Sequence, residues 1–425
     1  MVNGARLSRL LTWKRATTYA SVVGLLYLSA WAYSTFADSG PLTRTGEPTA
    51  GDYIAFYAAG RMLITGQGSH LYDPTTVRAM QVEAMHSAIP TLYDPFRNPP
   101  FFALLFAPLG LLELLPSFAV WSALNLACLA LAVWLALNNV PALRPHWRAI
   151  GILVLSFEPV YRGLIGGQNG DVSLLLYVLI YAAIRAGREP AAGAWAALGL
   201  FKPQLFLVFP IVFAASRRWR ALAAYGLVAG ALALLSVAIV GVDGVWAWSR
   251  IILDHEGGNA VKNAYRMHSL KAFFDLLLPS QPGIALALFV AGSAVLLVPL
   301  VRPWTVANSW REQLPLRWAL TSAVALLVDP HLLDYDVAVL VLSGLLIGAA
   351  LPQGRWWVFT FYVAFTTALL FDSSLPLGDA QLQLTVPLLV AFVWWSSRRL
   401  GQTLVPTQAP VALPEHRLRT VRPTN

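Results

Sequence analysis

The sequence is poor in charge and in cysteine. Charged residues make up 12% of it, about half the share typical of a soluble domain. The single cysteine, Cys128, lies in an apolar run, so the sequence holds neither a disulfide framework nor a thiolate metal site. No histidines stand at the spacing of a zinc motif. We therefore expect no metal and no cofactor.

Apolar residues are correspondingly abundant. They make up 57% of the chain, in continuous runs that exclude a barrel of alternating strands. The 16 Trp and 14 Tyr are residues that favour membrane interfaces. The formal charge of +9 comes from short basic clusters between the runs, which is the positive-inside pattern and not a nucleic-acid signal. The sequence predicts an all-α polytopic membrane protein with about 10–12 transmembrane helices.

The basic clusters also predict the orientation. Residues 1–18 carry four basic residues and no acid, which predicts a cytoplasmic N-terminus and a first span over 19–36. The loop 37–98 is then external, with two helices along the membrane surface at 54–64 and 75–89. We expect one membrane domain over residues 1–400 and a disordered, basic, cytoplasmic tail over 401–425.

Two apolar segments do not fit as simple spans. Residues 100–115 should form a partial or re-entrant element, because two full spans before the basic residues near 144 would reverse the orientation. Residues 191–215 have basic residues at both ends and are too short for two spans, so we expect a hairpin broken at Lys202-Pro203. The other predicted spans are 118–137, 149–161, 172–184, 222–240, 284–301, 319–328, 337–350, 358–371 and 384–395.

Asp52 stands just before the first predicted loop helix. A lone Asp at that position is commonly a helix cap, where it also interacts favourably with the helix dipole. The alternative is that Asp52 is a catalytic base facing the outer side of the membrane.

A glycine-rich stretch between two spans and an intramembrane lysine are further candidates. Gln168 and Asn169 lie among four glycines in residues 158–171, which indicates either a tight turn or a loop whose backbone comes close to a ligand. Lys202 is costly at membrane depth. It could hold an anionic lipid head group, or form an ion pair with Glu158 or another acid.

Basic residues and histidines of later external segments form the last group. Lys262, Arg266, His268 and Lys271 form a solvated or lipid-facing stretch, or alternatively a phosphate site. The full set of candidate substrate-binding residues is Arg61, Glu158, Arg162, Gln168, Asn169, Lys202, Arg266, His268 and His331.

These stretches, in this order, resemble glycosyltransferase family 87, the polyprenyl-phosphate-mannose-dependent α-mannosyltransferases of the C-type glycosyltransferase superfamily. No single stretch is specific, whereas their order and spacing together are. They are Gly51-Asp52-Tyr53, Leu71-Tyr72-Asp73-Pro74, Asn98-Pro99-Pro100-Phe101, Gly167-Gln168-Asn169, Lys202-Pro203-Gln204, Asp329-Pro330-His331 and Asp334-Tyr335-Asp336.

The resemblance implies a C-type fold and an enzyme of the cell envelope in the plasma (inner) membrane. It implies transfer of a hexose, by family default mannose, from a polyprenyl phosphate to a glycan or glycolipid hydroxyl on the outer face, with Asp52 as the base. A single base and a phosphate leaving group indicate inversion. A transporter or flippase of a lipid-linked sugar is the main alternative, and an envelope polymerase or ligase with a lipid-diphosphate donor is another.

Overall fold

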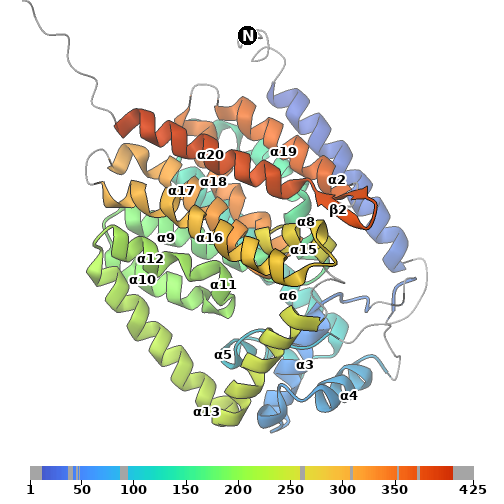
Figure 1. The fold of residues 1–425 in the computed structure, drawn as a ribbon. Helices are drawn as coiled ribbons and strands as arrows, with labels where there is room; N and C mark the ends of the chain where they lie inside the picture. Colours follow the sequence, from blue (N-terminus) through green and yellow to red (C-terminus); the bar gives the residue numbers. More distant parts are fainter. Residues whose placement is uncertain are drawn as a thin grey trace, which may run out of the picture.

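The protein is almost entirely helical. The computed structural model describes residues 12–36, 42–44, 46, 48–86, 94–258, 264–306, 310–351, 354–370 and 374–404. Within these residues the one sheet is an antiparallel hairpin of β1 (Ser374–Leu377) and β2 (Ala380–Gln383), which the sequence did not predict. The other elements are helices packed side by side around one core (Figure 1). The all-α class is confirmed.

Three helices of the described part are long and apolar enough to cross a membrane. They are α6 (Leu114–Asn139), α13 (Trp219–Gly258) and α16 (Pro282–Thr305), and they contain the predicted spans at 118–137, 222–240 and 284–301. Gly241 interrupts α13 with a φ of 73°, directly after the predicted end of that span. The protein is therefore a membrane protein, whereas the count of 10–12 spans stays a prediction.

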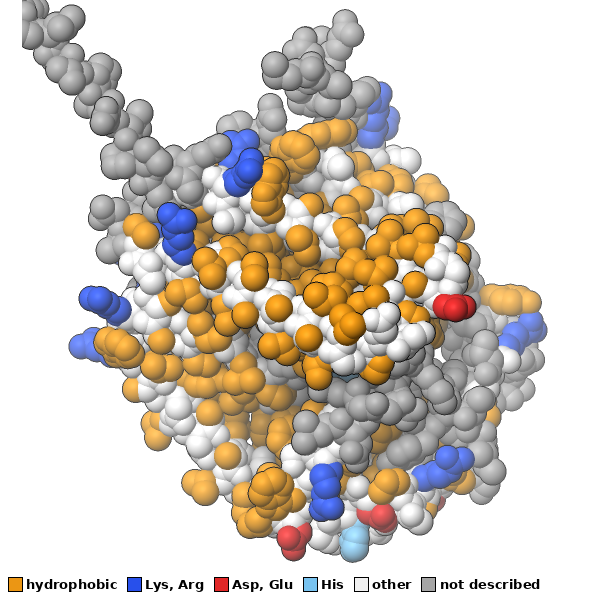
Figure 2. Space-filling model, viewed as in Figure 1, with side chains coloured by type: hydrophobic (Ala, Val, Ile, Leu, Met, Phe, Trp, Pro, Cys, Tyr) orange, Lys and Arg blue, Asp and Glu red, His pale blue; other side chains and the backbone are white. Residues whose placement is uncertain are grey.

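The face of the molecule that carries α16 is apolar. In Figure 2, hydrophobic side chains are the commonest coloured type across the middle of this face, and Lys and Arg side chains stand near its edges. On α16, the side chains of Ile284, Val290, Val295 and Val298 are each more than half exposed. An exposed apolar face of this kind suits contact with lipid tails.

Most remaining predicted spans correspond to single helices, some of them short. The exception is 149–161, which is wrong as a single helix, because the chain breaks between α7 (Trp147–Leu155) and α8 (Glu158–Ile165). Pro159 lacks an amide donor and therefore starts a new helix. The others are α2 (Trp13–Phe36), α9 (Gly170–Arg185), α17 (Trp310–Val328), α18 (Leu340–Ala350), α19 (Gly354–Leu370) and α20 (Thr385–Leu404).

Neither unusual segment forms the continuous helix of a simple span. Residues 100–115 form only α5 (Pro100–Ala103), the 3₁₀ turn η2 (Leu109–Leu111) and the first residues of α6, and their re-entrant course stays a prediction. The hairpin consists of α10 (Glu189–Leu198), η4 (Gly199–Phe201), α11 (Pro203–Phe206) and α12 (Val208–Ala215). Its two ends meet, because Arg218 Nη1 lies 3.3 Å from Glu189 Oε1.

The first loop contains both predicted helices, α3 (Tyr53–Ile64) and α4 (Pro74–Ala84), joined by η1 (Gly68–His70). Residues 87–89 of the second prediction lie outside the described residues. However, α3 is a core helix and not a surface helix, since nine of its 12 residues are buried. Its small residues allow this: a Cβ on Gly60 would stand 2.2 Å from the carbonyl oxygen of Phe106.

The predictions for the two ends of the chain concern residues that the structure does not describe. Residues 1–11, which include Arg6 and Arg9, and residues 405–425 of the tail lie outside the described residues. In Figure 1, α2 starts and α20 ends at one end of the molecule, while α3 and α4 lie at the other. Which end is cytoplasmic stays a prediction.

The contact between α10 and α13 provides a test of the packing. A Cβ on Gly193 would lie 2.0 Å from the carbonyl oxygen of Ala221, whereas a Cβ on Gly226 would meet nothing within 4 Å. We expect Gly193→Ala to destabilise the protein by roughly 1–3 kcal/mol and to lower its midpoint of thermal unfolding in detergent.

The matched control is Gly226→Ala on the partner helix, which should leave the midpoint unchanged or raise it, because Ala favours helix interiors over Gly. Equal midpoints for the two variants would contradict the close contact of α10 with α13.

Candidate active site

Asp52 stands at the start of α3, yet its side chain does not cap the helix. Its own backbone is helical, with φ −66° and ψ −9°, and its carboxylate accepts no hydrogen bond from the first turn. Instead, Oδ2 of Asp52 accepts a hydrogen bond of 2.7 Å from Nε2 of Gln168. The capping alternative is therefore wrong, and the carboxylate faces the glycine-rich stretch that the sequence analysis singled out.

Glycines bring these two segments together. A Cβ on Gly51, whose φ is +59°, would lie 2.9 Å from Cα of Gly166, and a Cβ on Gly167 would lie 2.6 Å from Cβ of Tyr53. Trp121 Nε1 donates to the carbonyl oxygen of Gly167 at 2.7 Å. The glycines thus allow a close backbone approach to the first loop, and Gly51 and Gly166 also line the cavity described next.

A cavity of about 230 Å³ opens beside Asp52. Two guanidinium groups line it, from Arg162 on α8 and from Arg266 in η5 (Ala264–Arg266), together with Tyr335 in η6 (Asp334–Val339). Segments far apart in the sequence therefore contribute to one site. The remaining lining residues are Trp31, Ser34, Thr35, Thr43, Pro48, Thr49, Gly51, Ile165 and Gly166.

Each arginine of the cavity has an acidic neighbour. Arg162 Nε lies 2.9 Å from Oε1 of the buried Glu158, and Arg266 Nε lies 3.9 Å from Oδ2 of Asp334. Burial opposes the charge on Arg266, but Asp334 and Asp52 together raise its pKa. Two cations and the carboxylate of Asp52 thus line one cavity, and two further carboxylates lie next to its arginines. This arrangement suits binding of both a phosphate and a sugar hydroxyl.

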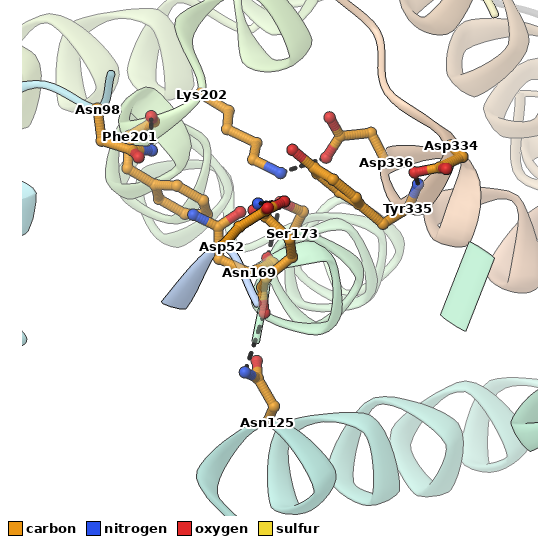
Figure 3. A network of polar contacts seen from close by, with 11 residues as sticks. Asp52, Asn98, Asn125, Asn169, Ser173, Phe201, Lys202, Asp334, Tyr335 and Asp336 are labelled. Atoms are coloured by element: carbon orange, nitrogen blue, oxygen red, sulfur yellow. Dashed lines mark hydrogen bonds and ion pairs between the residues drawn. The ribbon is translucent and has the colours of Figure 1, made fainter. Parts of the chain in front are cut away.

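Lys202 forms the ion pair that was one of its two alternatives, with Asp336 in place of Glu158. Lys202 Nζ bonds to Oδ1 of Asp336, and both side chains are buried. The ammonium group also lies 4.7 Å from the centre of the Tyr335 ring. Figure 3 shows Asp52, Tyr335 and the Lys202–Asp336 pair converging. Tyr335 lines the cavity and Lys202 does not, so Lys202 supports the site from the interior.

Asn169 lies in the same polar region, fully buried. Its backbone carbonyl accepts a 3.3 Å bond from the Ser173 hydroxyl. Its side-chain nitrogen and oxygen have no hydrogen-bond partner among the described residues. A buried amide without partners costs about 1–3 kcal/mol, which makes it a candidate for contact with water or substrate.

Seven of the nine substrate-binding candidates do not line the cavity, and three of these make contacts elsewhere. Arg61 donates from Nη1 to the carbonyl oxygen of Gly110 at 3.1 Å, and so connects α3 to η2. His268 is buried with Nδ1 2.8 Å from the Thr385 hydroxyl, and burial lowers its pKa to about 3, aided by Arg266. His331 donates its backbone amide to Asp329 Oδ1 at 2.8 Å.

The described basic residues near position 266 make different contacts and do not all lie at the cavity. Lys262 lies outside the described residues. Lys271, in α15 (Leu270–Leu277), pairs with Asp275 at 2.5 Å. Among the described residues of this stretch, Arg266 alone lines the cavity. Within the described residues no cluster of His, Cys, Asp and Glu could hold a metal ion.

One known protein family matches some of the segments that form this site. The family model of glycosyltransferase family 87 matches residues 96–333, more than half of the chain. The chain belongs to glycosyltransferase family 87. The match covers Arg162, Lys202 and Arg266 but begins after Asp52, so the family assignment does not rest on the base candidate. No curated protein and no solved structure matched.

Sequence reasoning about this family 87 glycosyltransferase missed one acidic residue. Asp94 stands 25% exposed near the end of the first loop, with Oδ1 3.0 Å from Arg97 Nη1. Burial and the charge of Asp52 raise its pKa to about 7. Asp94 belongs to none of the polar motifs of the sequence analysis. The sequence feature that could have drawn attention to it is its position four residues before Asn98-Pro99-Pro100.

The buried Lys202–Asp336 pair gives a test of its structural role. We expect Lys202→Met and Asp336→Asn each to destabilise the protein by roughly 3–5 kcal/mol, because each leaves one buried charge without its partner. The double variant Lys202→Met/Asp336→Asn should lose much less than the sum of the two single losses, as measured by thermal unfolding in detergent. Additive losses would show that the two groups do not depend on each other.

Proposed function

We propose that this membrane glycosyltransferase moves a hexose, with mannose as the expected sugar, from a polyprenyl-phosphate donor to a hydroxyl group of a glycan or glycolipid. The reaction takes place on the outer face of the plasma membrane, within one domain over residues 1–400, and both termini are cytoplasmic. The observation that carries the proposal is the position of Asp52, which lies at a cavity with two arginines and does not cap its helix.

Such a transfer requires a base and a phosphate-binding group. Asp52 accepts the proton of the acceptor hydroxyl, whose oxygen attacks the anomeric carbon of the donor. The bond from that carbon to the phosphate oxygen breaks, and the phosphate leaves without needing a proton. A single attack from the opposite side inverts the anomeric centre.

The arginines of the cavity fit the phosphate. Arg162 and Arg266 offer planar donor groups, the type that matches phosphate oxygens best. Glu158 and Asp334 hold the two side chains beside Asp52 before the donor arrives. Gln168 fixes one oxygen of Asp52 and so orients the base. Lys202, Asn169 and Tyr335 form the polar interior behind this arrangement.

Asp52→Asn is the first test. We expect the variant to lose about 10²–10⁴-fold of the transfer rate, because Asn cannot accept the acceptor proton, while donor binding is retained. The measurement follows labelled mannose from polyprenyl-phosphate mannose onto a membrane-lipid extract, with purified protein in lipid nanodiscs.

Asp73→Asn is the matched control. Asp73 lies in the same loop, at the start of α4, and caps that helix by accepting a 3.0 Å bond from the Thr76 amide. Asn also caps well, so this variant should keep both fold and transfer. Full transfer by Asp52→Asn would place the base elsewhere. Label that crosses a vesicle bilayer and never reaches an acceptor would favour the transporter alternative.

Arg266→Gln tests the phosphate site. Loss of one charged hydrogen bond costs about 1.5–3 kcal/mol, so the KM for the donor should rise by about 10–100-fold with a smaller change in kcat. Arg61→Gln removes the same charge from α3, outside the cavity, and should leave the donor KM unchanged. Equal donor KM values for Arg266→Gln and the unchanged protein would rule out a phosphate contact at Arg266.

A further inference from the structure

Of the two cavity arginines, Arg266 has the longer contact with its acidic neighbour. Its Nε lies 3.9 Å from Oδ2 of Asp334, whereas Nε of Arg162 lies 2.9 Å from Oε1 of Glu158. A separation of 3.9 Å is too long for a hydrogen bond, and the side chain of Arg266 is 38% exposed. The ion pair alone therefore does not fix the guanidinium group, whose position depends on the backbone that carries it.

That backbone is paired with the segment that carries Asp334. Met267 and Leu333 form an isolated antiparallel β-bridge, so the register places Arg266 directly opposite Asp334. Side chains alternate between the two faces of an extended chain. Met267 and Leu333 accordingly pack together in a small apolar cluster, while Arg266 lines the cavity. The β-bridge is thus the local structure that directs Arg266 toward the site.

A single bridge needs support from outside, because even a complete two-stranded hairpin is only marginally stable by itself. Gln383, the last residue of β2, provides this support. Its side-chain amide nitrogen donates a hydrogen bond to the backbone carbonyl oxygen of Met267. Both residues are buried, so this carbonyl group requires a partner within the protein. Figure 1 shows β2 beside α15, the helix that follows Arg266.

Two further side chains surround this hydrogen bond. Nδ1 of His268 lies 3.4 Å from the amide nitrogen of Gln383 and 2.8 Å from the Thr385 hydroxyl. Gln383, His268 and Thr385 are each at most 1% exposed, and we call them the Gln383 cluster. Deeply buried polar groups are costly to leave without partners, so each member of the cluster restricts the positions of the others.

We propose that Gln383 is a positioning residue for the phosphate site: by holding the carbonyl group of Met267, it fixes the backbone of Arg266 so that the guanidinium group meets the donor phosphate beside Asp52. This inference rests on the proposed function, in which Arg266 binds that phosphate. It also gives His268 a role. His268 does not line the cavity, but it supports the segment of Arg266 from the interior.

Donor kinetics test the proposal. Gln383→Met keeps about the same side-chain length and removes the donor group. We expect the donor KM to rise about 3–10-fold, the effect of one neutral hydrogen bond, with little change in kcat. Added to Arg266→Gln, the same substitution should change the donor KM no further, because it acts through Arg266. Transfer is followed in lipid nanodiscs with labelled polyprenyl-phosphate mannose.

Gln381→Met is the matched control. Gln381 lies in the same strand but is exposed, and its amide oxygen accepts a 3.2 Å bond from the Ser374 hydroxyl. This variant should keep the donor KM of the unchanged protein. Thr385→Val removes one hydroxyl from the Gln383 cluster while preserving its shape, so it should raise the donor KM in the same direction and by less than Gln383→Met.

Three kinetic results would overturn the proposal. The first is an unchanged donor KM in both Gln383→Met and Thr385→Val. The second is a loss that falls on kcat while the donor KM stays constant, which is the pattern of general destabilisation. The third is a double variant in which the effects of Gln383→Met and Arg266→Gln on KM multiply, because Gln383 would then act independently of Arg266.

Hydrogen exchange tests the support itself without any substrate. The amide of His268 donates to the carbonyl oxygen of Leu332 at 3.0 Å across the β-bridge. Its exchange therefore reports how often the bridge opens. Gln383→Met should speed this exchange several-fold, whereas Gln381→Met should not, and equal rates in the two variants contradict the proposal. If the unchanged protein transfers no sugar, the proposed function fails, while hydrogen exchange still decides whether Gln383 holds the segment.

Discussion

The site depends on one close approach, the contact of the first loop with the turn between α8 and α9. Gly51 and Gly166 lie so close that a side chain on Gly51 would collide with the opposite backbone. This contact brings Gln168 within hydrogen-bonding distance of Asp52. Without it, the carboxylate of Asp52 would lose the hydrogen bond that orients it, and Arg162 would not line the same cavity as Asp52.

The charges around this contact balance each other. Arg162 and Arg266 each have a carboxylate neighbour, and the buried Lys202 has Asp336. Leaving the buried Lys202 or Glu158 without its partner would be costly, whereas the pairs keep these groups in place. On the proposed function, the phosphate of the donor would compete with the carboxylates for the two arginines.

Much of the fold could be predicted from the sequence. Low charge, continuous apolar runs and basic clusters indicated an all-α membrane protein, and α6, α13 and α16 lie where the apolar runs are longest. The same hydropathy reasoning identified both segments that are not simple spans. Pro159 illustrates its limit, because a proline predicts a break but the apolar run before it still looks like one span. It also missed the burial of α3, since small residues tell little about what packs on them.

The sequence by itself determined the class of the protein, its apolar spans and which polar residues required an explanation. Only the tertiary structure decided which of them meet: Gln168 with Asp52, and Lys202 with Asp336. It also left Arg61, His268 and His331 outside the cavity. The physical reason is that hydropathy is a local property of the chain, whereas these contacts join residues more than 40 positions apart. Their partners are set by glycine contacts and aromatic packing, which no residue-by-residue pattern records.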